Sequence, residues 1–350
     1  MKEAQIPRGG SVLLRLPNWA GDVVMATACV EAIKKERPDI RIAVAVRRHL
    51  VPLLNDYPGI NEVITIEGKG LRANFYLLAK MRGVKYDASI VFAKGFRDGL
   101  IARLSGIPAR IGYSVNSRKP FFTHPVDMTE ELWNSHHALQ FLELIKPLGI
   151  SSTDPRPFLP VTEAGLRRAK GIVSGLGIEE RGFLVFHIGA SKFPRAYHAE
   201  RFAEAAADVG GRSGMKIVLV GTGEDRPYVD SFRKVFPGCV DASGKIPLGD
   251  LPSFLSLARL FVGNDSGPMH VASAVGTPVV AVFGPGSPEK TAPLLPENRL
   301  RIVYSGLKCS PCRQSFFRDC DPSANGKPPC LELVSSGVLT GRILELLDKS

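Results

Sequence analysis

The stretch NDSGPMHVASAVGTPVVAVFG, residues 264 to 284, decides the fold of this chain of 350 residues. It opens with polar and small residues, continues as an apolar helical segment and ends in PVVAVFG, which is typical of a buried strand. The run ARLFVG (258–263) directly before it predicts another strand. Strand, polar turn, helix and strand in this order indicate a parallel sheet with helices on its faces.

The first part of the chain follows the same rhythm. SVLLRL (11–16) predicts a strand, and a helical pattern continues from PNWAGD to the helix-stopping Pro38. IRIAVAV (40–46) and YDASIVFA (86–93) predict two more strands, and DGLIARLSGI (98–107) predicts a helix after the second of them.

A proline-rich segment, SSTDPRPFLP (151–160), reads as a linker, after which the rhythm restarts. The strands expected next are GFLVFHI (182–188) and MKIVLV (215–220), and the helices are AERFAEAAADV (199–209) and YVDSFRKVF (228–236). We therefore expect two doubly wound, Rossmann-like α/β domains facing a central cleft, with no internal sequence repeat. Their expected bounds are residues 1–155 and 156–334, followed by a closing helix in residues 335–350.

Composition narrows the class of protein. At 44% hydrophobic residues the chain can bury two cores, but its longest apolar run is broken at Gly276 to Pro278 and cannot span a bilayer. The first apolar run is interrupted by Arg15 and lacks a small-residue cleavage site, so a signal peptide is not expected. We expect a cytoplasmic protein.

The formal charge of +11 and the pI near 9.5 favour polyanionic partners, namely nucleic acid, phosphorylated sugars or an anionic membrane face. Nucleic acid is disfavoured because the basic residues are scattered and no helix-turn-helix, zinc-finger or RNP pattern occurs. A solvated basic surface without any partner is the alternative.

Ligands of doubly wound sheets collect beyond the carboxyl ends of the strands, so residues between a strand and the next helix are the candidates for function. In PNWAGDVVMA, Gly21 allows a tight turn and Asp22 stands at the helix start. Asp22 is either a helix N-cap or a general base that takes a proton from an incoming hydroxyl. The stretch has no GxGxxG pattern, which argues against a dinucleotide-dependent dehydrogenase.

The second candidate is HIGASKFPRAYHAERF, in which a small-residue turn ending at Ser191 is followed by Lys192 and Arg195 and then by a helix beginning near His198. Cations beside free helical N–H groups suit phosphate oxygens. The alternative is that Lys192 and Arg195 are ordinary solvated charges.

The third candidate is the opening of residues 264–284. Asp265 and Ser266 stand where an N-cap belongs, and Gly267 lets the backbone approach a ligand closely. Pro268 suits the first helical turn, so the N–H groups of Met269 and His270 could face a pyrophosphate. His270 taken alone is better explained by a structural role.

Four of the six cysteines follow the spacing C-x2-C-x7-C-x9-C: Cys309, Cys312, Cys320 and Cys330. Unpaired thiols are the default expectation in a reducing compartment, and a zinc site or disulfides are the alternatives. Cys29 and Cys239 look like buried packing residues.

Four stretches carry a resemblance to a known family. NDSGPMHVASAVGTPVVAVFG, RLPNWAGDVVMA, FRDGLIARLSGIPARIGYSVNSR and CSPC resemble the bacterial ADP-heptose:lipopolysaccharide heptosyltransferases, which are inverting glycosyltransferases of family 9 with the GT-B fold. The Asn-Trp pair before Gly21 is closest to the heptosyltransferase II branch. One departure stands out, because the family's Lys-Arg-Trp-Pro before the helix is replaced by residues 195–198, Arg-Ala-Tyr-His.

The resemblance implies a role for each matched position. Asp22 would be the catalytic base. The residues expected to bind the nucleotide sugar are Ser191, Lys192, Arg195, Gly221, Glu224, Asp265, Ser266, Gly267, Met269 and His270, with Glu224 at the ribose. The residues expected to meet the acceptor are Asn18, Trp19, Lys94, Arg97 and Arg118, with Lys119 a weaker candidate; ordinary basic surface is the alternative for the cations.

The reaction implied is inverting transfer of L-glycero-D-manno-heptose from ADP-heptose to an inner-core heptose on Kdo–lipid A. We expect no required cofactor and no metal site, although a divalent cation could assist. The expected protein is a monomer, peripheral on the inner membrane, with ADP-heptose and a lipid A-core acceptor as partners. The alternatives are heptosyltransferase I, a protein heptosyltransferase, a nucleotide-sugar epimerase, or a non-catalytic nucleotide-sugar binding protein.

Overall fold

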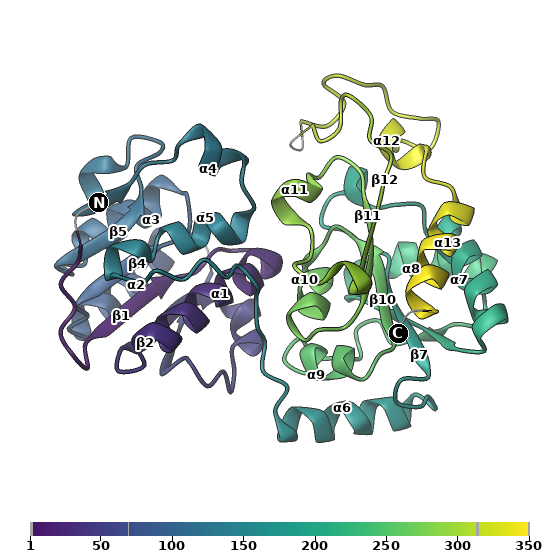
Figure 1. Ribbon diagram of the computed structural model, residues 1–350, viewed down its shortest axis with the longest axis horizontal. Helices are drawn as coiled ribbons and strands as arrows, with labels where there is room; N and C mark the ends of the chain where they lie inside the picture. The colour runs from purple at the N-terminus through teal and green to yellow at the C-terminus, as the bar shows by residue number, and fades with distance from the viewer. Residues whose placement is uncertain (1–2, 69, 313–314, 349–350) are drawn as a thin grey trace. The chain divides into compact units, whose positions relative to one another are not determined.

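The computed structural model describes residues 3–68, 70–312 and 315–348. The chain divides into two compact units, residues 1–160 and 161–350, and each contains one six-stranded sheet with helices packed around it (Figure 1). The division falls at the end of the proline-rich segment, whereas the sequence placed the boundary after residue 155. All strand pairs recorded in both sheets are parallel, which confirms the predicted doubly wound α/β class.

The sheet of the first unit has the order β3-β2-β1-β4-β5-β6. Its strands are β1 (Ser11–Arg15), β2 (Arg41–Arg47), β3 (Glu62–Ile66), β4 (Ala88–Val91), β5 (Ala109–Tyr113) and β6 (His124–Val126). Its α-helices are α1 (Ala20–Glu36), α2 (Leu71–Gly83), α3 (Phe96–Leu104), α4 (Glu130–Asn134) and α5 (His137–Glu143). Short 3-10 turns are η1 (Arg48–Leu53), η2 (Lys119–Phe121) and η3 (Lys146–Leu148).

The central strands of this sheet are apolar on both faces because helices cover both sides. Leu14 of β1, for example, is fully buried and pairs with Val44 of β2 and Ile90 of β4. The sequence reasoning named β1, β2 and β4 but missed β3, β5 and β6. Those strands are shorter or partly polar, and β6 contains Pro125, which suits the edge that it occupies.

Helix α1 begins directly after the loop that follows β1. Its N-cap is Trp19, and Asp22 is the third residue of the helix, in its first turn. The interpretation of Asp22 as an N-cap is therefore wrong. The helix N-terminus still favours an ionised carboxylate at this position, because its N–H groups carry partial positive charge.

The sheet of the second unit has the order β12-β11-β10-β7-β8-β9. Its strands are β7 (Phe183–His187), β8 (Lys216–Val220), β9 (Val240–Asp241), β10 (Leu260–Asn264), β11 (Val279–Phe283) and β12 (Leu300–Tyr304). Its α-helices are α6 (Glu163–Gly175), α7 (Ala199–Ser213), α8 (Arg226–Val235), α9 (Leu251–Ser256), α10 (Gly267–Ala274), α11 (Pro288–Thr291), α12 (Pro329–Glu332) and α13 (Ser336–Leu347). Short 3-10 turns are η4 (Phe193–Arg195), η5 (Gly223–Asp225) and η6 (Glu297–Arg299).

The polar residues at the start of 264–284 are followed by helix α10, whose side chains are mostly apolar and lie inside the unit. Ser266 is the N-cap of α10, and every residue from Met269 to Ala274 is buried. The strand that follows, β11, is buried along its whole length between β10 and β12. The predicted strand–turn–helix–strand unit is confirmed.

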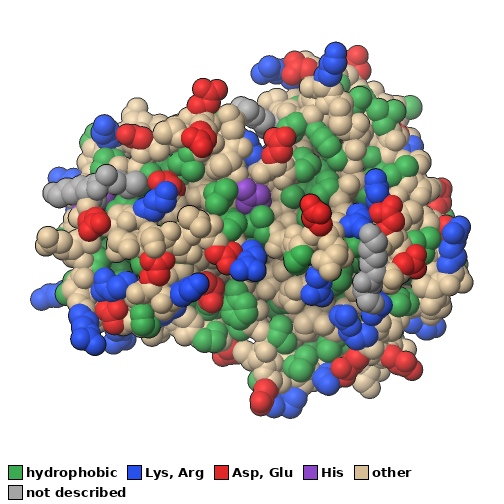
Figure 2. Space-filling model, in the orientation of Figure 1, with side chains coloured by type: hydrophobic (Ala, Val, Ile, Leu, Met, Phe, Trp, Pro, Cys, Tyr) green, Lys and Arg blue, Asp and Glu red, His purple; other side chains and the backbone are tan. Residues whose placement is uncertain are grey.

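Across the described ranges, no helix is both long enough and apolar enough to cross a membrane. On the face of the molecule in Figure 2, basic side chains are interspersed with acidic ones.

Candidate active site

In each unit the order of the strands reverses beside the first strand of its sheet. In the first unit this switch lies between β1 and β4, and in the second unit between β7 and β10. Loops leaving neighbouring strands in opposite directions open a crevice there, which is where doubly wound folds bind ligands. The sequence-predicted residues lie in the loops after β1, β4, β7, β8 and β10 or in the first turn of the helix that follows, except Arg118 and Lys119, which follow β5.

The loop after β1 brings Asp22 to a histidine that the sequence analysis missed. The Asp22 Oδ1 atom lies 3.7 Å from Nδ1 of His137, the first residue of α5, and the two side chains are 29% and 33% exposed. A carboxylate that reaches solvent beside an imidazole can accept a proton from a hydroxyl that approaches it. His137 left no signal in the sequence, since it is remote from Asp22 along the chain and belongs to no recognised motif.

Asn18 is held at the same strand end by two arginines. Its Oδ1 atom accepts hydrogen bonds from Arg15 Nη2 at 2.9 Å and from Arg47 Nε at 3.1 Å. Arg15 also donates to Asp98, in the first turn of α3, at 2.9 Å. This network ties the loops after β1 and β4 together and leaves the neighbouring Trp19 65% exposed.

The three cations expected at the acceptor differ in exposure. Arg97 is exposed, and Lys94 is half-buried, with Nζ donating to Gln140 Oε1 at 2.9 Å. Arg118 is fully buried, and its Nη1 atom donates to Ala93 O at 2.7 Å and Gly95 O at 3.2 Å. Arg118 therefore supports the loop after β4 from inside, and we exclude it from the proposed acceptor site. Its exposure could not be judged from the sequence, because a basic residue after a turn is usually solvated.

In the second unit, the loops after β7 and β10 meet through an ion pair. Arg195 Nη2 donates to both the carbonyl oxygen and the Oδ2 atom of Asp265, each at 2.7 Å. Arg195 Nε is buried with no hydrogen-bond partner among the described residues. A buried guanidinium N–H without a partner indicates that an acceptor belongs there.

His187, the last residue of β7, is a second residue that the sequence analysis missed. Its Nδ1 atom lies 3.1 Å from Ser266 Oγ. Burial lowers the pKa of the His187 imidazole below its ordinary value, and the nearby Asp225 carboxylate opposes this shift. The imidazole therefore contacts the N-cap of α10 and lies near enough to the loop after β8 for the charge of Asp225 to act on it.

Asp225, not Glu224, is the acid held in the loop after β8. Its Oδ2 atom accepts hydrogen bonds from Thr222 N at 2.7 Å and Thr222 Oγ1 at 3.1 Å, which completes a capping box at η5. Glu224 is exposed. The pattern Thr-x-x-Asp at 222–225 is a capping signal that could have pointed to Asp225.

Three glycines leave space for the carboxylates of Asp225 and Asp265. A Cβ atom on Gly189 would lie 1.8 Å from Asp225 Oδ1, and one on Gly221 would lie 2.7 Å from Asp225 Oδ2. A Cβ atom on Gly286 would lie 2.2 Å from Asp265 Oδ2. At these three positions a side chain would require the carboxylate of Asp225 or Asp265 to move.

Asn264, the last residue of β10, holds the loop after β7 in place. Its side chain accepts from Tyr197 N at 2.9 Å and donates to Ile188 O at 2.9 Å and Gly189 O at 3.1 Å. It is fully buried, so these three bonds satisfy groups that would otherwise be costly to bury.

The N–H groups expected to face a pyrophosphate are only partly available. Met269 N donates to Ser266 O at 3.2 Å, and Met269 is fully buried, so the expectation that it faces the ligand is wrong. His270 is buried as well. Gly267 and Ser266 are half-buried and keep the N-terminal end of α10 within reach of a ligand.

Lys192 and Ser191 are exposed in the loop after β7, and Lys192 Nζ lies 5.3 Å from the ring centroid of Phe316.

Phe316 lies in the segment between β12 and α12, which contains the first three of the four clustered cysteines. Cys309, Cys312, Cys320 and Cys330 line one pocket as free thiols. Within the described parts of the chain, no group of three or more His, Cys, Asp or Glu side chains is arranged to hold a metal ion.

Comparison with known proteins agrees with this architecture. The sequence profile of glycosyltransferase family 9 (heptosyltransferase) matches residues 75–318. Lipopolysaccharide heptosyltransferase 3 of Escherichia coli is 25% identical over 280 residues, covering 75% of this chain and 80% of that protein. Lipopolysaccharide heptosyltransferase 2 of Escherichia coli K12 is 26% identical over 313 residues, covering 84% and 88%.

The structure of the E. coli ADP-heptose LPS heptosyltransferase II superposes with a TM-score of 0.79 at 22% identity, over 97% of this chain and 99% of that one. The two parallel six-stranded sheets thus define a glycosyltransferase fold of the GT-B type. The chain belongs to glycosyltransferase family 9, the heptosyltransferase family.

Proposed function

We propose that this protein is an inverting glycosyltransferase that moves L-glycero-D-manno-heptose from ADP-heptose to an inner-core heptose of a Kdo–lipid A acceptor. The observation that carries the proposal is the accessible carboxylate of Asp22, at the strand end of the first unit and 3.7 Å from His137. The relatives supply the substrate class, since the name of the similar E. coli structure includes ADP-heptose.

The reaction needs one base and one way to stabilise a leaving diphosphate. Asp22 takes the proton of the acceptor hydroxyl while the acceptor oxygen attacks the anomeric carbon from the face opposite the diphosphate. The bond from that carbon to the diphosphate oxygen breaks, and its electron pair leaves with ADP. General-base catalysis of this kind contributes roughly 10²–10⁴-fold to the rate.

The second unit holds the donor in this proposal. Arg195, whose Nε has no hydrogen-bond partner among the described residues, and Lys192 supply positive charge for the diphosphate. The N-terminal end of α10, at Ser266 and Gly267, adds partial positive charge. These groups stabilise ADP as it leaves, so the reaction runs without a required metal ion, although a divalent cation could assist.

The acceptor meets the first unit through Asn18, Trp19, Lys94 and Arg97. We also propose that this unit rests on the anionic inner face of the cytoplasmic membrane, where the lipid A acceptor is anchored. Supporting this, α2 and α3 pack together and expose five large apolar side chains, the α2–α3 apolar patch: Phe75, Tyr76, Phe96, Leu100 and Leu104. The exposed cations Lys80, Arg97 and Arg103 lie on the same two helices.

The deciding experiment is a transfer assay with ADP-heptose and a set of truncated lipid A cores. We expect transfer to a core that carries one heptose, and a loss of roughly 10²-fold or more in kcat for Asp22→Asn with unchanged ADP affinity. Transfer only to a core without heptose, or only to a more complete core, would move the proposal to another heptosyltransferase type. Full activity of Asp22→Asn would remove the base assignment.

A further inference from the structure

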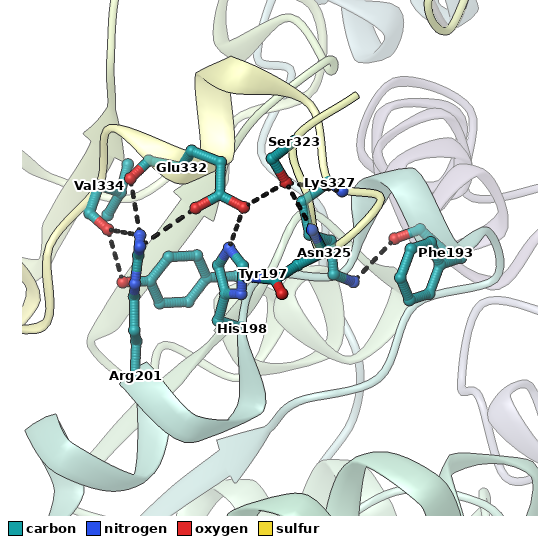
Figure 3. A network of polar contacts seen from close by, with 9 residues as sticks. All are labelled: Phe193, Tyr197, His198, Arg201, Ser323, Asn325, Lys327, Glu332 and Val334. Atoms are coloured by element: carbon teal, nitrogen blue, oxygen red, sulfur yellow. Dashed lines mark hydrogen bonds and ion pairs between the residues drawn. The ribbon is translucent and has the colours of Figure 1, made fainter. Parts of the chain in front are cut away.

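Lys327 lies in the segment between β12 and α12 and is only 5% exposed. Its Nζ atom donates to the carbonyl oxygen of Phe193 at 3.2 Å and lies 3.5 Å from the centroid of the Phe193 ring (Figure 3). The ring of Tyr228, on α8, is 5.7 Å away. A buried ammonium needs acceptors and aromatic faces to replace water, and Phe193 supplies one of each.

Phe193, which Lys327 contacts, is the first residue of the short turn that ends at Arg195. In η4 (Phe193–Arg195), Phe193 O also accepts from Ala196 N at 3.1 Å, which closes the turn. Arg195 then reaches Asp265 through Nη2. Lys327 thus fixes the first residue of a short turn whose last residue faces the second-unit site.

The segment that carries Lys327 is itself anchored to the start of α7. Glu332 Oε1 accepts from Ser323 Oγ at 2.6 Å and lies 3.1 Å from His198 Nε2, and its Oε2 accepts from Arg201 Nη2 at 3.1 Å (Figure 3). Contacts therefore hold the chain on both sides of Arg195, at Phe193 where the turn begins and at His198 three residues after it ends.

We propose that Lys327 is a positioning residue of the donor site, which holds the Phe193–Arg195 turn so that the Arg195 guanidinium meets the diphosphate of the donor. This inference rests on the proposed function, because it takes Arg195 to bind the diphosphate. Lys327 itself contacts no reacting atom.

Burial lowers the pKa of Lys327 to about 8, with Glu200 and Glu332 opposing that shift. The titratable groups that face it are Glu200 and His198 at the start of α7, Tyr228 on α8 and Glu332 on α12. Below this pKa the ammonium holds the turn. Above it the neutral amine loses both the charge-assisted hydrogen bond and the cation–π contact, so the affinity for ADP falls as the pH rises through 8.

The test measures ADP binding by calorimetry, together with donor KM and kcat, on both sides of that pKa. Lys327→Met keeps an unbranched side chain, one atom shorter and without the charge. We expect it to weaken ADP binding about tenfold below the pKa, corresponding to ~1.4 kcal/mol, and to flatten the pH dependence. Donor KM rises more than kcat falls. The variant should fold, since an apolar chain replaces a buried charge.

Two further variants keep the result interpretable. Lys327→Arg stays charged at every accessible pH and should retain ADP affinity above the pKa, where wild type loses it. Lys308→Met removes an exposed lysine from the same segment and should match wild type. Equal ADP affinity and equal pH dependence in wild type and Lys327→Met would overturn the inference, while a wild type that binds no ADP would overturn the proposed function with it.

Discussion

The Asp22 carboxylate lies 3.7 Å from the Nδ1 atom of His137, and the two residues stand in the first turns of different helices, α1 and α5. Neither side chain is enclosed, so a hydroxyl can approach the carboxylate from solvent. In the proposed mechanism, the imidazole orients the Asp22 carboxylate without exchanging a proton itself.

His137→Gln is the first test of that relationship. The 3.7 Å contact between two partly exposed groups is worth no more than the about 0.2–1 kcal/mol of a surface ion pair, so we expect kcat to fall about fivefold at most, far less than for Asp22→Asn. Steady-state kinetics with ADP-heptose measures the effect, and His49→Gln, at an exposed histidine of the same unit, serves as the control. A loss as large as that of Asp22→Asn would instead make His137 the base.

Gly189→Ala tests the close approach of Asp225. The new Cβ would displace the carboxylate from the capping box with Thr222, and overpacking of this kind costs about 1–3 kcal/mol. We expect a lower Tm in thermal unfolding and weaker ADP binding. Gly223→Ala, where a Cβ would meet nothing within 4 Å, is the matched control. If Gly189→Ala melts and binds ADP as Gly223→Ala does, the acid is not fixed there.

The α2–α3 apolar patch predicts binding to anionic bilayers. We expect wild type to sediment with vesicles of phosphatidylglycerol and phosphatidylethanolamine, more weakly at high salt, and hardly with phosphatidylcholine. Phe75→Ser with Leu104→Ser should lower the partition coefficient about tenfold or more, since each buried side chain contributes about 1.5–3 kcal/mol. Val338→Ser, an exposed apolar residue on α13, is the control. Unchanged partitioning of the double variant would argue against this surface.

The sequence was sufficient to predict strands such as β11, whose residues are all buried. β11, VVAVF, is apolar throughout and was predicted, whereas β12, LRIVY, is only half-buried and was missed. Asp22 and Asp265 could be named as candidates because strand ends that lead into helices are visible in a local pattern. His137 and Asp225 were not found, because one comes from a distant helix and the other was overlooked beside Glu224. The burial of Arg118 could not be predicted, because its charge indicated a solvated side chain, whereas Nη1 donates to two backbone carbonyl oxygens inside the unit.

Two glycines of the second unit, Gly221 and Gly286, lie against the carboxylates of Asp225 and Asp265. They limit how the substrate specificity of the proposed donor site can be changed by mutation. Where Gly221 and Gly286 lie against carboxylates, the wall of the site is backbone, and backbone cannot be exchanged residue by residue. In the proposed donor site, adaptation to a different nucleotide would have to proceed through positions that present side chains to solvent, such as Ser191 and Glu224. A library confined to those exposed positions would leave the fixed frame intact.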